Sequence, residues 1–305
     1  MIDLSIVIVN WNVRDLLRRC LATVFAATPY ALEVIVVDNA SSDGSLDMLR
    51  AEFPQVHLIA NADNRGFPAA NNQGLSAARG RYAMALNPDT EIAGDALIRI
   101  IAYLDRHPDV GALGPQLLNS DGSIQSSRRR FPTFVTALFE STWLQGIAPH
   151  GVLRRFYVDD VPASVTQEVD WVTGACIAVR REVLEGVGGF DESFFMYSEE
   201  LDWCKRVRSA GWKIVYLPEA KIVHHVGKSS EQAVAARHIH FQTSKVRYFR
   251  KYHGRVVAET LRLILLTMYL WQIGLESFKA LLGHKRAMRL QRIHVYWQVM
   301  RSGLK

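Results

Sequence analysis

Short apolar runs that end in polar residues recur through the first 90 residues of the chain. A run of this kind is typical of a strand that is buried on both faces of a sheet. Segments with apolar residues at helical spacing follow the first three runs. Strands that alternate with helices predict an α/β fold with a mostly parallel sheet wound by right-handed crossovers. The four predicted strands span residues 4–9, 33–37, 56–60 and 82–86.

Polar loops follow the second, third and fourth predicted strands, at residues 38–45, 61–67 and 87–91. The carboxyl ends of parallel strands lie on one edge of the sheet, where open α/β proteins bind their ligands. At that edge Asp89 is placed to hold a divalent cation against a substrate diphosphate, and Arg65 to pair with the phosphate oxygens. The sequence therefore predicts a nucleotide-diphosphate site.

The loops also have a purely structural interpretation. Asp89 or Thr90 is equally suited to cap a helix that begins near Ala93, and the local pattern alone favours that role. Residues 38–45 likewise form an ordinary turn rich in Asp, Asn and Ser. The chain has no G-x-G-x-x-G after its first strand and no G-x-x-x-x-G-K-[ST], which argues against a dinucleotide dehydrogenase and a P-loop NTPase.

Composition fits a globular protein with a basic tail. The chain has 305 residues, of which 49% are apolar, and a net charge of +6, which indicates one large domain or one domain with an appendage. Cys20, Cys176 and Cys204 are odd in number and far apart, so we expect buried thiols in a reducing, cytosolic compartment. The chain starts directly with a strand and lacks the charged start of a signal peptide.

Seven segments of the chain carry motifs in a characteristic order and spacing. The early segments read S-I-V-I-V-N-W-N (5–12), V-D-N-A-S-S-D-G-S (37–45), N-R-G-F-P-A-A-N-N (64–72) and L-N-P-D-T (86–90). The later ones read D-W-V-T-G-A-C-I-A-V-R-R (170–181), G-G-F-D-E-S-F-F-M-Y-S-E-E-L-D-W-C-K-R (188–206) and H-H-V-G-K-S-S (224–230). Together they resemble the inverting family 2 glycosyltransferases, and most of all their bacterial rhamnosyltransferase branch. The resemblance covers roughly residues 4–252 and is specific for the family, but less so for the sugar.

The resemblance implies a GT-A fold that uses a nucleoside-diphosphate sugar and usually Mg2+ or Mn2+. It implies that Asp38 contacts the base or ribose and that Asp89 and His224 hold the metal, although a pair of histidines is more often structural. Asn87 stands where a strict D-x-D motif has a second carboxylate, which predicts weak metal binding that leans on substrate phosphates. The implied donor-binding residues are Asn10, Asp38, Asn39, Asp43, Asn64, Arg65, Gly66, Asn71 and Asn87.

Segment 188–206 carries the expected catalytic group. Inverting transfer needs a carboxylate that removes the acceptor hydroxyl proton while that oxygen attacks the anomeric carbon. The family match places Glu200 in this role, with Glu199 as the fallback because the family has Asp where this chain has Glu200; Asp202 completes the group. Without the family match, the three acids equally form the acidic first turn of a helix that ends at Gly211.

Residues 171–178 are expected to form a strand edge under the acceptor sugar, with Trp171, Thr173 and Gly174 as acceptor-binding residues. Trp171 either stacks on a sugar face or belongs to the core. The three arginines at 128–130 either face an acceptor diphosphate or lie in a solvated loop, and the loop is the favoured interpretation.

The last quarter of the chain is expected to be helical. Its apolar stretch 261–275 is shorter than the ~20 residues of a spanning helix, so we expect it to lie on a membrane or in a protein groove. Basic residues flanking Trp271 and Trp297 are typical of an interfacial segment, with a homo-oligomer contact as the alternative. The tail has no acidic residue after Lys279, and its later basic residues are Lys285, Arg286, Arg289, Arg292, Arg301 and Lys305.

These features predict a GT-A catalytic domain at residues 1–230, with a nucleotide-binding half (1–110) and an acceptor half (111–230), and a helical, membrane-associating region at 231–305. We expect a peripheral enzyme on the cytoplasmic face of the cell membrane that moves L-rhamnose from dTDP-rhamnose to a polyprenyl-linked or growing cell-surface polysaccharide. Donors linked to UDP or GDP are alternatives within the class. A non-catalytic carbohydrate-binding module is the alternative outside it, and Asp89, Glu200 and Asp202 argue against that. No nucleic-acid partner is expected.

Overall fold

The computed structural model describes residues 2–27, 31–140, 142–225, 234–283 and 285–305. The chain forms two compact units. The first comprises Met1–Phe131, His150–Phe195 and Glu199–Ser229, and the second comprises Pro132–Pro149, Met196–Ser198 and Ser230–Lys305. Residues 226–230 of the last family motif lie outside the described residues, as does the predicted boundary near residue 230.

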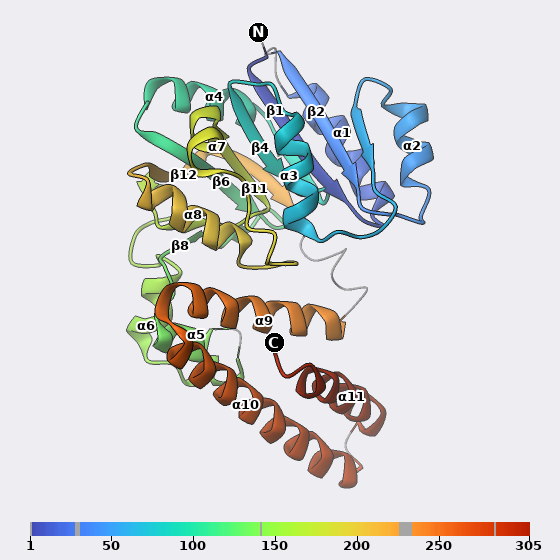
Figure 1. The fold of residues 1–305 in the computed structure, drawn as a ribbon, viewed down its shortest axis with the longest axis vertical. Helices are drawn as coiled ribbons and strands as arrows, with labels where there is room; N and C mark the ends of the chain where they lie inside the picture. Colours follow the sequence, from blue (N-terminus) through green and yellow to red (C-terminus); the bar gives the residue numbers. More distant parts are fainter. Residues whose placement is uncertain (1, 28–30, 141, 226–233, 284) are drawn as a thin grey trace. The chain divides into compact units, whose positions relative to one another are not determined.

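A mixed sheet organises the first unit (Figure 1). In spatial order its main strands are β3 (His57–Ala60), β2 (Leu32–Asp38), β1 (Leu4–Asn10), β4 (Tyr82–Leu86), β11 (Cys176–Arg180), β6 (Val110–Leu118), β12 (Lys213–His224) and β5 (Thr90–Ala93). β1 pairs in parallel with β2 and β4, β2 with β3, and β6 with β12. β11 runs antiparallel to both of its neighbours. The predicted α/β fold with a mostly parallel sheet is confirmed.

Helices cover both faces of this sheet (Figure 1). On one face lie α1 (Arg14–Ala26), α2 (Ser45–Glu52) and α4 (Ala96–Arg106), and on the other α3 (Phe67–Ala77), α7 (Arg181–Val187) and α8 (Glu199–Ser209). Along β1, Ile6 and Ile8 pack into the first of these layers, whereas Val7 and Val9 pack into the second. Because successive side chains of a strand point to opposite faces, this alternation buries the strand on both sides. The expected burial of the three cysteines is also confirmed.

Short elements complete the first unit. β7 (Ile124–Gln125) pairs with β6, β9 (Gln167–Glu168) pairs with β12, β10 (Trp171–Val172) pairs with β8 (Arg128–Arg129), and α6 is His150–Phe156. One local interpretation is corrected here. The helix expected to begin near Ala93 starts at Ala96, and Thr90–Ala93 instead form strand β5 against β12. Pairing with a distant strand overrides the capping pattern of the local sequence.

The second unit is helical. Its elements are α5 (Phe134–Phe139), the 3-10 helix η1 (Trp143–Ile147), α9 (Val234–His253), α10 (Arg255–Leu281) and α11 (Arg286–Ser302). Arg289 on α11 is buried and donates to both carboxylate oxygens of Glu276 on α10, at 2.6 and 2.7 Å. The expectation that Arg289 belongs to the basic surface is therefore wrong, because its charge is used inside the unit.

Helix α10 is longer than the apolar stretch predicted at residues 261–275. By length and composition alone it could cross a membrane, and it is the one helix of this kind in the described part of the chain. A buried helix of a soluble protein can have the same length and composition, but only 22% of the most apolar stretch of α10 is buried. The argument that this stretch is too short to span a membrane therefore does not hold.

Candidate active site

Asn10 and Asp38 end adjacent strands and lie opposite each other in the register of β1 and β2. Asn10 Nδ2 donates to Asp38 Oδ2 (2.8 Å) and Ser41 Oγ (3.0 Å), and Ser41 N donates to Asp38 Oδ1 (2.9 Å). Asn10 and Asp38 are fully buried, yet Asn10 Oδ1 has no hydrogen-bond partner among the described residues. A buried acceptor without a partner costs about 1–3 kcal/mol, so this oxygen can receive a donor group of a ligand.

Asn39 is the centre of an amide network that shapes the loop between β3 and α3. Its Nδ2 donates to Asn64 Oδ1 (3.0 Å) and Gly66 O (3.3 Å), and its Oδ1 accepts from Arg65 N (3.2 Å). Asn61 Nδ2 also donates to Asn39 Oδ1, at 3.0 Å. Arg65 itself is exposed. The network therefore fixes the backbone of the loop and presents the Arg65 guanidinium to solvent and to anionic ligands.

Gly66 allows this loop to touch the segment that precedes α8. Its φ is +84°, and a Cβ there would lie 2.8 Å from Phe195 O. Phe67 N donates to the same carbonyl, at 2.9 Å. Asn71 is buried one turn further into α3, where its Nδ2 donates to Phe67 O (2.9 Å). The loop between β3 and α3 and the chain that leads to Glu199 are thus held together by backbone contact.

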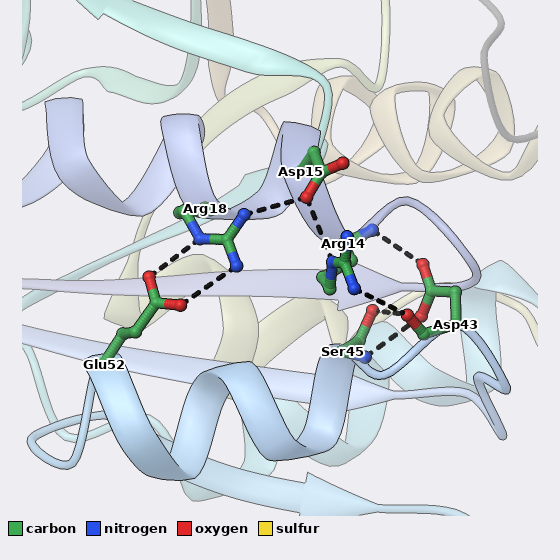
Figure 2. A network of polar contacts seen from close by, with 6 residues as sticks. All are labelled: Arg14, Asp15, Arg18, Asp43, Ser45 and Glu52. Atoms are coloured by element: carbon green, nitrogen blue, oxygen red, sulfur yellow. Dashed lines mark hydrogen bonds and ion pairs between the residues drawn. The ribbon is translucent and has the colours of Figure 1, made fainter.

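Asp43 fastens the starts of α1 and α2 together (Figure 2). Its Oδ2 accepts from Arg14 N (2.7 Å), and its Oδ1 accepts from Ser45 N (3.1 Å) and Ser45 Oγ (2.5 Å). Burial raises the pKa of Asp43, but these hydrogen bonds outweigh it and the net shift is downward. Arg18 adds a second brace between the helices by donating to both oxygens of Glu52. Asp43 therefore orders the loop that carries Asp38 and Asn39.

Asp89 and His224 come together where β5 pairs with β12. His224 Nε2 lies 3.3 Å from Asp89 Oδ1, and both side chains are largely buried. The adjacent His225 pairs with Glu91 at 2.8 Å. The described residues contain no group of three or more His, Cys, Asp or Glu side chains that could hold a metal. A carboxylate and an imidazole facing each other fit a divalent cation whose other ligands are water and substrate phosphate.

Glu199 and Glu200 open α8; Glu199 is buried, and Glu200 is half-buried with its Oε2 atom buried. Burial raises the pKa of Glu199, and the neighbouring Glu200 charge raises it further. Burial also raises the pKa of Glu200, against opposing backbone N–H groups and the Arg129 charge. Each carboxyl has one buried oxygen without a hydrogen-bond partner in the described structure. A buried carboxyl with a raised pKa is suited to exchange a proton near neutral pH.

The Asp89 loop and Glu200 are brought together by the pairing of β4 with β11. Asn87 N donates to Ala175 O (2.9 Å), and the preceding Gly174 N donates to Glu200 Oε1 (3.4 Å). Asn87 Oδ1 is another buried oxygen without a partner among the described residues. Unpaired oxygens at the ends of these strands favour ligands that carry hydroxyl groups or a cation, as a nucleotide sugar with its metal does.

Asp202 is fully buried and forms an ion pair with Arg206, one turn later on α8 (2.9 Å). Arg206 also donates to Val187 O (2.9 Å) and Gly189 O (2.6 Å). The bend at Gly188, where φ is +80°, is thereby held against the start of α8. In this arrangement Asp202 positions the helix that carries Glu199 and Glu200.

The predicted acceptor residues lie on and beside β10. The half-buried ring of Trp171 packs against the core, and its Nε1 donates to Arg130 O (3.0 Å). Thr173 Oγ1 is buried without a partner among the described residues. The favoured interpretation of residues 128–130 as a solvated loop is wrong for Arg128, which is buried in β8 and donates to the carbonyls of Val158 and Val161.

Two positioning side chains were not predicted from the sequence. Asn72 exchanges two hydrogen bonds with the backbone of Phe190, at 2.8 and 2.9 Å, and so anchors the chain that leads to Glu199. Asn72 lies inside the 64–72 motif, and this motif is the sequence feature that could have indicated its importance. Gln125 Oε1 lies 2.7 Å from His224 Nδ1. Its two-residue strand carries no pattern that would have indicated this contact.

A mostly parallel sheet with a carboxylate–imidazole pair where β5 meets β12 and a pair of carboxyl groups at the start of α8 is typical of a nucleotide-sugar transferase of the GT-A type. Residues 5–188 match glycosyl transferase family 2. The chain belongs to this family and is a glycosyltransferase. Residues 155–303 also match glycosyl transferase family 21.

Three proteins illustrate the similarity. An N-acetylglucosaminyl-diphospho-decaprenol L-rhamnosyltransferase from Mycobacterium tuberculosis is 30% identical over 251 residues, covering 77% of this chain and 81% of that protein. The rhamnosyltransferase WbbL of Escherichia coli is 27% identical over 229 residues, covering 72% and 82%. The structure of a mannosyltransferase from Pyrobaculum calidifontis in complex with GDP-Man and Mn2+ superposes with a TM-score of 0.57 at 21% identity, covering 99% and 84%. This last likeness concerns the fold.

Proposed function

We propose that this glycosyltransferase moves L-rhamnose from dTDP-rhamnose to a polyprenyl-linked or growing cell-surface polysaccharide acceptor. Two similar proteins named above are rhamnosyltransferases, which supports the sugar. The name of the mycobacterial one supports an acceptor attached to a lipid diphosphate. The structural observation that carries the chemistry is the Glu199–Glu200 pair beside the Asp89 loop, each carboxyl with one buried oxygen that has no hydrogen-bond partner among the described residues.

The donor is bound at the ends of β1 to β4. Asp38 and Asn10 contact the base or ribose, and Arg65 pairs with the diphosphate. Asp89 and His224 hold Mg2+ or Mn2+, which when bound neutralises the charge of the leaving diphosphate. The remaining donor-binding residues act through the loops that they shape: Asn39, Asp43, Asn64, Gly66, Asn71 and Asn87.

Glu200 acts as the base. Its carboxylate accepts the proton of the acceptor hydroxyl while that oxygen attacks the anomeric carbon and the bond to the diphosphate breaks. The attack comes from the face opposite the leaving group, so the configuration inverts. Gly174 N orients Glu200 Oε1, which leaves Oε2 for the acceptor. Burial raises the pKa of Glu200, Glu199 is the fallback base, and Asp202 positions the helix through Arg206.

Residues 1–230 form the catalytic domain, with its nucleotide-binding half at 1–110 and its acceptor half at 111–230, and residues 231–305 bring it to the cytoplasmic face of the membrane. An apolar face of α10 is exposed, and basic residues of α11 and of the chain that follows it are exposed as well. Apolar burial and attraction to anionic lipid add in such a segment. The exposed apolar residues are Val256, Leu263, Leu270, Trp271, Phe278 and Leu281.

A donor screen tests this function. Purified enzyme is incubated with Mn2+, a lipid-linked acceptor and, separately, dTDP-rhamnose, UDP-glucose, UDP-galactose and GDP-mannose, and the release of nucleoside diphosphate is measured. We expect release from dTDP-rhamnose to exceed that from the other donors by at least ~10-fold, which is about 1.4 kcal/mol of discrimination. The Asp89→Ala variant provides the background rate. A preference for a UDP- or GDP-linked sugar refutes the rhamnosyl assignment, and no release from any donor supports a non-catalytic module.

A further inference from the structure

The two ring nitrogens of His224 face different partners. Nδ1 lies 2.7 Å from Gln125 Oε1, and Nε2 lies 3.3 Å from Asp89 Oδ1. Only a nitrogen without a hydrogen has a lone pair to offer a cation. Which nitrogen carries the hydrogen therefore decides whether His224 can act together with Asp89 as a metal ligand. The partners of Gln125 settle this question.

A chain of hydrogen bonds, in which the donor of each bond can be assigned, starts at Asp121 in the turn between β6 and β7. Ser123 Oγ lies 2.6 Å and Ser123 N 2.9 Å from Asp121 Oδ1. The hydrogen bond from the Ser123 side chain, followed by that from its backbone, lowers the pKa of Asp121. An ionised carboxylate only accepts, so the Ser123 hydroxyl must donate to it. Ser123 Oγ in turn accepts from Asn119 Nδ2, at 2.9 Å.

The amide side chains of Asn119 and Gln125 continue this chain of hydrogen bonds to the His224 ring. With its Nδ2 used by Ser123, Asn119 presents Oδ1 to Gln125 Nε2, at 2.9 Å. Gln125 therefore turns Oε1 toward His224, and this oxygen can only accept. His224 Nδ1 must then carry the hydrogen. Turning either amide over would place two donors or two acceptors against each other along this chain.

The next residue, His225, has the opposite arrangement. Its Nε2 lies 2.8 Å from Glu91 Oε1, a carboxylate oxygen that can only accept, so this nitrogen carries the hydrogen. Its Nδ1 lies 2.7 Å from Ser120 Oγ, whose hydroxyl is free to rotate and donate. Two adjacent histidines therefore face two carboxylates in different ways, Glu91 in β5 and Asp89 directly before it. His225 donates to Glu91, whereas His224 turns an unprotonated Nε2 toward Asp89.

We propose that Asn119, Ser123 and Gln125 are positioning residues that hold His224 in the Nδ1–H form and so present its Nε2, with Asp89, to the divalent cation of the donor. The proposal rests on the proposed function for the presence of the cation. The form of the His224 ring, however, is inferred from this chain of hydrogen bonds. It leaves Nε2 and Asp89 Oδ1 as two acceptors 3.3 Å apart, an arrangement that favours a cation there. Partners of this kind behind a metal ligand typically change metal affinity by about 10–100-fold when removed.

Nitrogen-15 NMR of the histidine side chains tests the ring form without metal or donor. The full-length protein is labelled at histidine and studied at about pH 8.5, above the usual imidazole pKa. The His224 signals are assigned by their loss in His224→Gln. We expect the Nδ1–H form for His224 and the Nε2–H form for His225. An Nε2–H form of His224, or a ring with hydrogen on both nitrogens, overturns the proposal.

Metal affinity tests the consequence. Binding of Mn2+ in the presence of saturating dTDP is measured by electron paramagnetic resonance for wild type, Gln125→Leu and the matched control Ser120→Ala, which removes the equivalent hydrogen bond from His225. We expect the dissociation constant to rise ~10-fold or more in Gln125→Leu and to stay within about 3-fold in Ser120→Ala. Gln125→Glu can still accept from Nδ1, so it should bind Mn2+ no more weakly than wild type and should show the Nδ1–H form.

The outcomes distinguish a failure of the positioning role of Gln125 from a failure of the proposed metal site. Equal Mn2+ affinity in wild type and Gln125→Leu refutes the positioning role. Wild type that binds no Mn2+ with dTDP refutes the metal site itself, whatever the ring form. If Gln125→Leu does not fold, Gln125→Glu and the wild-type NMR still decide, because a Gln125→Glu protein with weakened Mn2+ binding or the Nε2–H form contradicts the argument.

Discussion

Replacing Glu200 by Gln should move turnover and stability in opposite directions. Gln is nearly isosteric but cannot accept the acceptor proton, so turnover should fall by ~10²-fold or more. The folded-state pKa of Glu200 is raised. Between the unfolded pKa, about 4.3, and the folded one, the folded state holds more protons, so wild-type stability falls as pH rises. A neutral Gln at position 200 does not lose stability in this way as the pH rises.

The magnitude follows from the surroundings of the side chain. Glu200 Oε2 is buried without a partner among the described residues, and the adjacent Glu199 is buried too. Removing one charge from such a place should stabilise the fold by about 1–2 kcal/mol at pH 8. Each kcal/mol should raise the Tm by roughly 2–4 °C. The gain should shrink toward pH 4, where both carboxyls are mostly protonated in the folded and in the unfolded chain.

Thermal unfolding between pH 4 and 8 and steady-state turnover measure the two effects, with donor affinity from calorimetry as the control. A stability gain that does not depend on pH would show that charge is not its cause. An equal loss of donor affinity would make Glu200 a binding residue. If Glu199→Gln loses turnover and Glu200→Gln does not, the base is Glu199.

Three further changes test the other parts of the site and the tail. Asp89→Ala should abolish transfer with the fold intact, and excess EDTA should do the same to wild type; full activity in both removes the metal hypothesis. Gly66→Ala meets Phe195 O and a φ of +84°, so donor affinity should fall and unfolding free energy drop by about 1–3 kcal/mol; unchanged calorimetry would refute this. Replacing exposed tail residues by Gln should release the protein from anionic vesicles and spare donor hydrolysis in solution, with unchanged sedimentation at low and high salt favouring an oligomer contact. These residues are Lys285, Arg286, Arg301 and Lys305.

Much of the sheet edge at the carboxyl ends of β1, β2 and β4 could be predicted because its signals are local. A buried strand followed at once by a polar residue gives both the strand and the position of that residue at the sheet edge. Asn10, Asp38 and Asn87 follow this rule, with Asp89 two residues after Asn87, and the strand containing Tyr82 begins and ends where predicted. The residues that hold these groups in place were harder to find, because amides such as Asn119 and Gln125 act across a turn whose sequence has no regular pattern.

The sequence by itself determined the alternation of strands and helices, the polar ends of the first four strands and the acidic start of α8, because each depends on neighbouring residues. Only the tertiary structure decided that Thr90–Ala93 pair with β12, which brings Asp89 to His224. It also decided that Arg128 and Arg289 are buried, since their partners lie far along the chain or on another helix. A charged residue reads as exposed in a linear pattern. Its burial becomes possible only when a distant carbonyl or carboxylate arrives to pair with it.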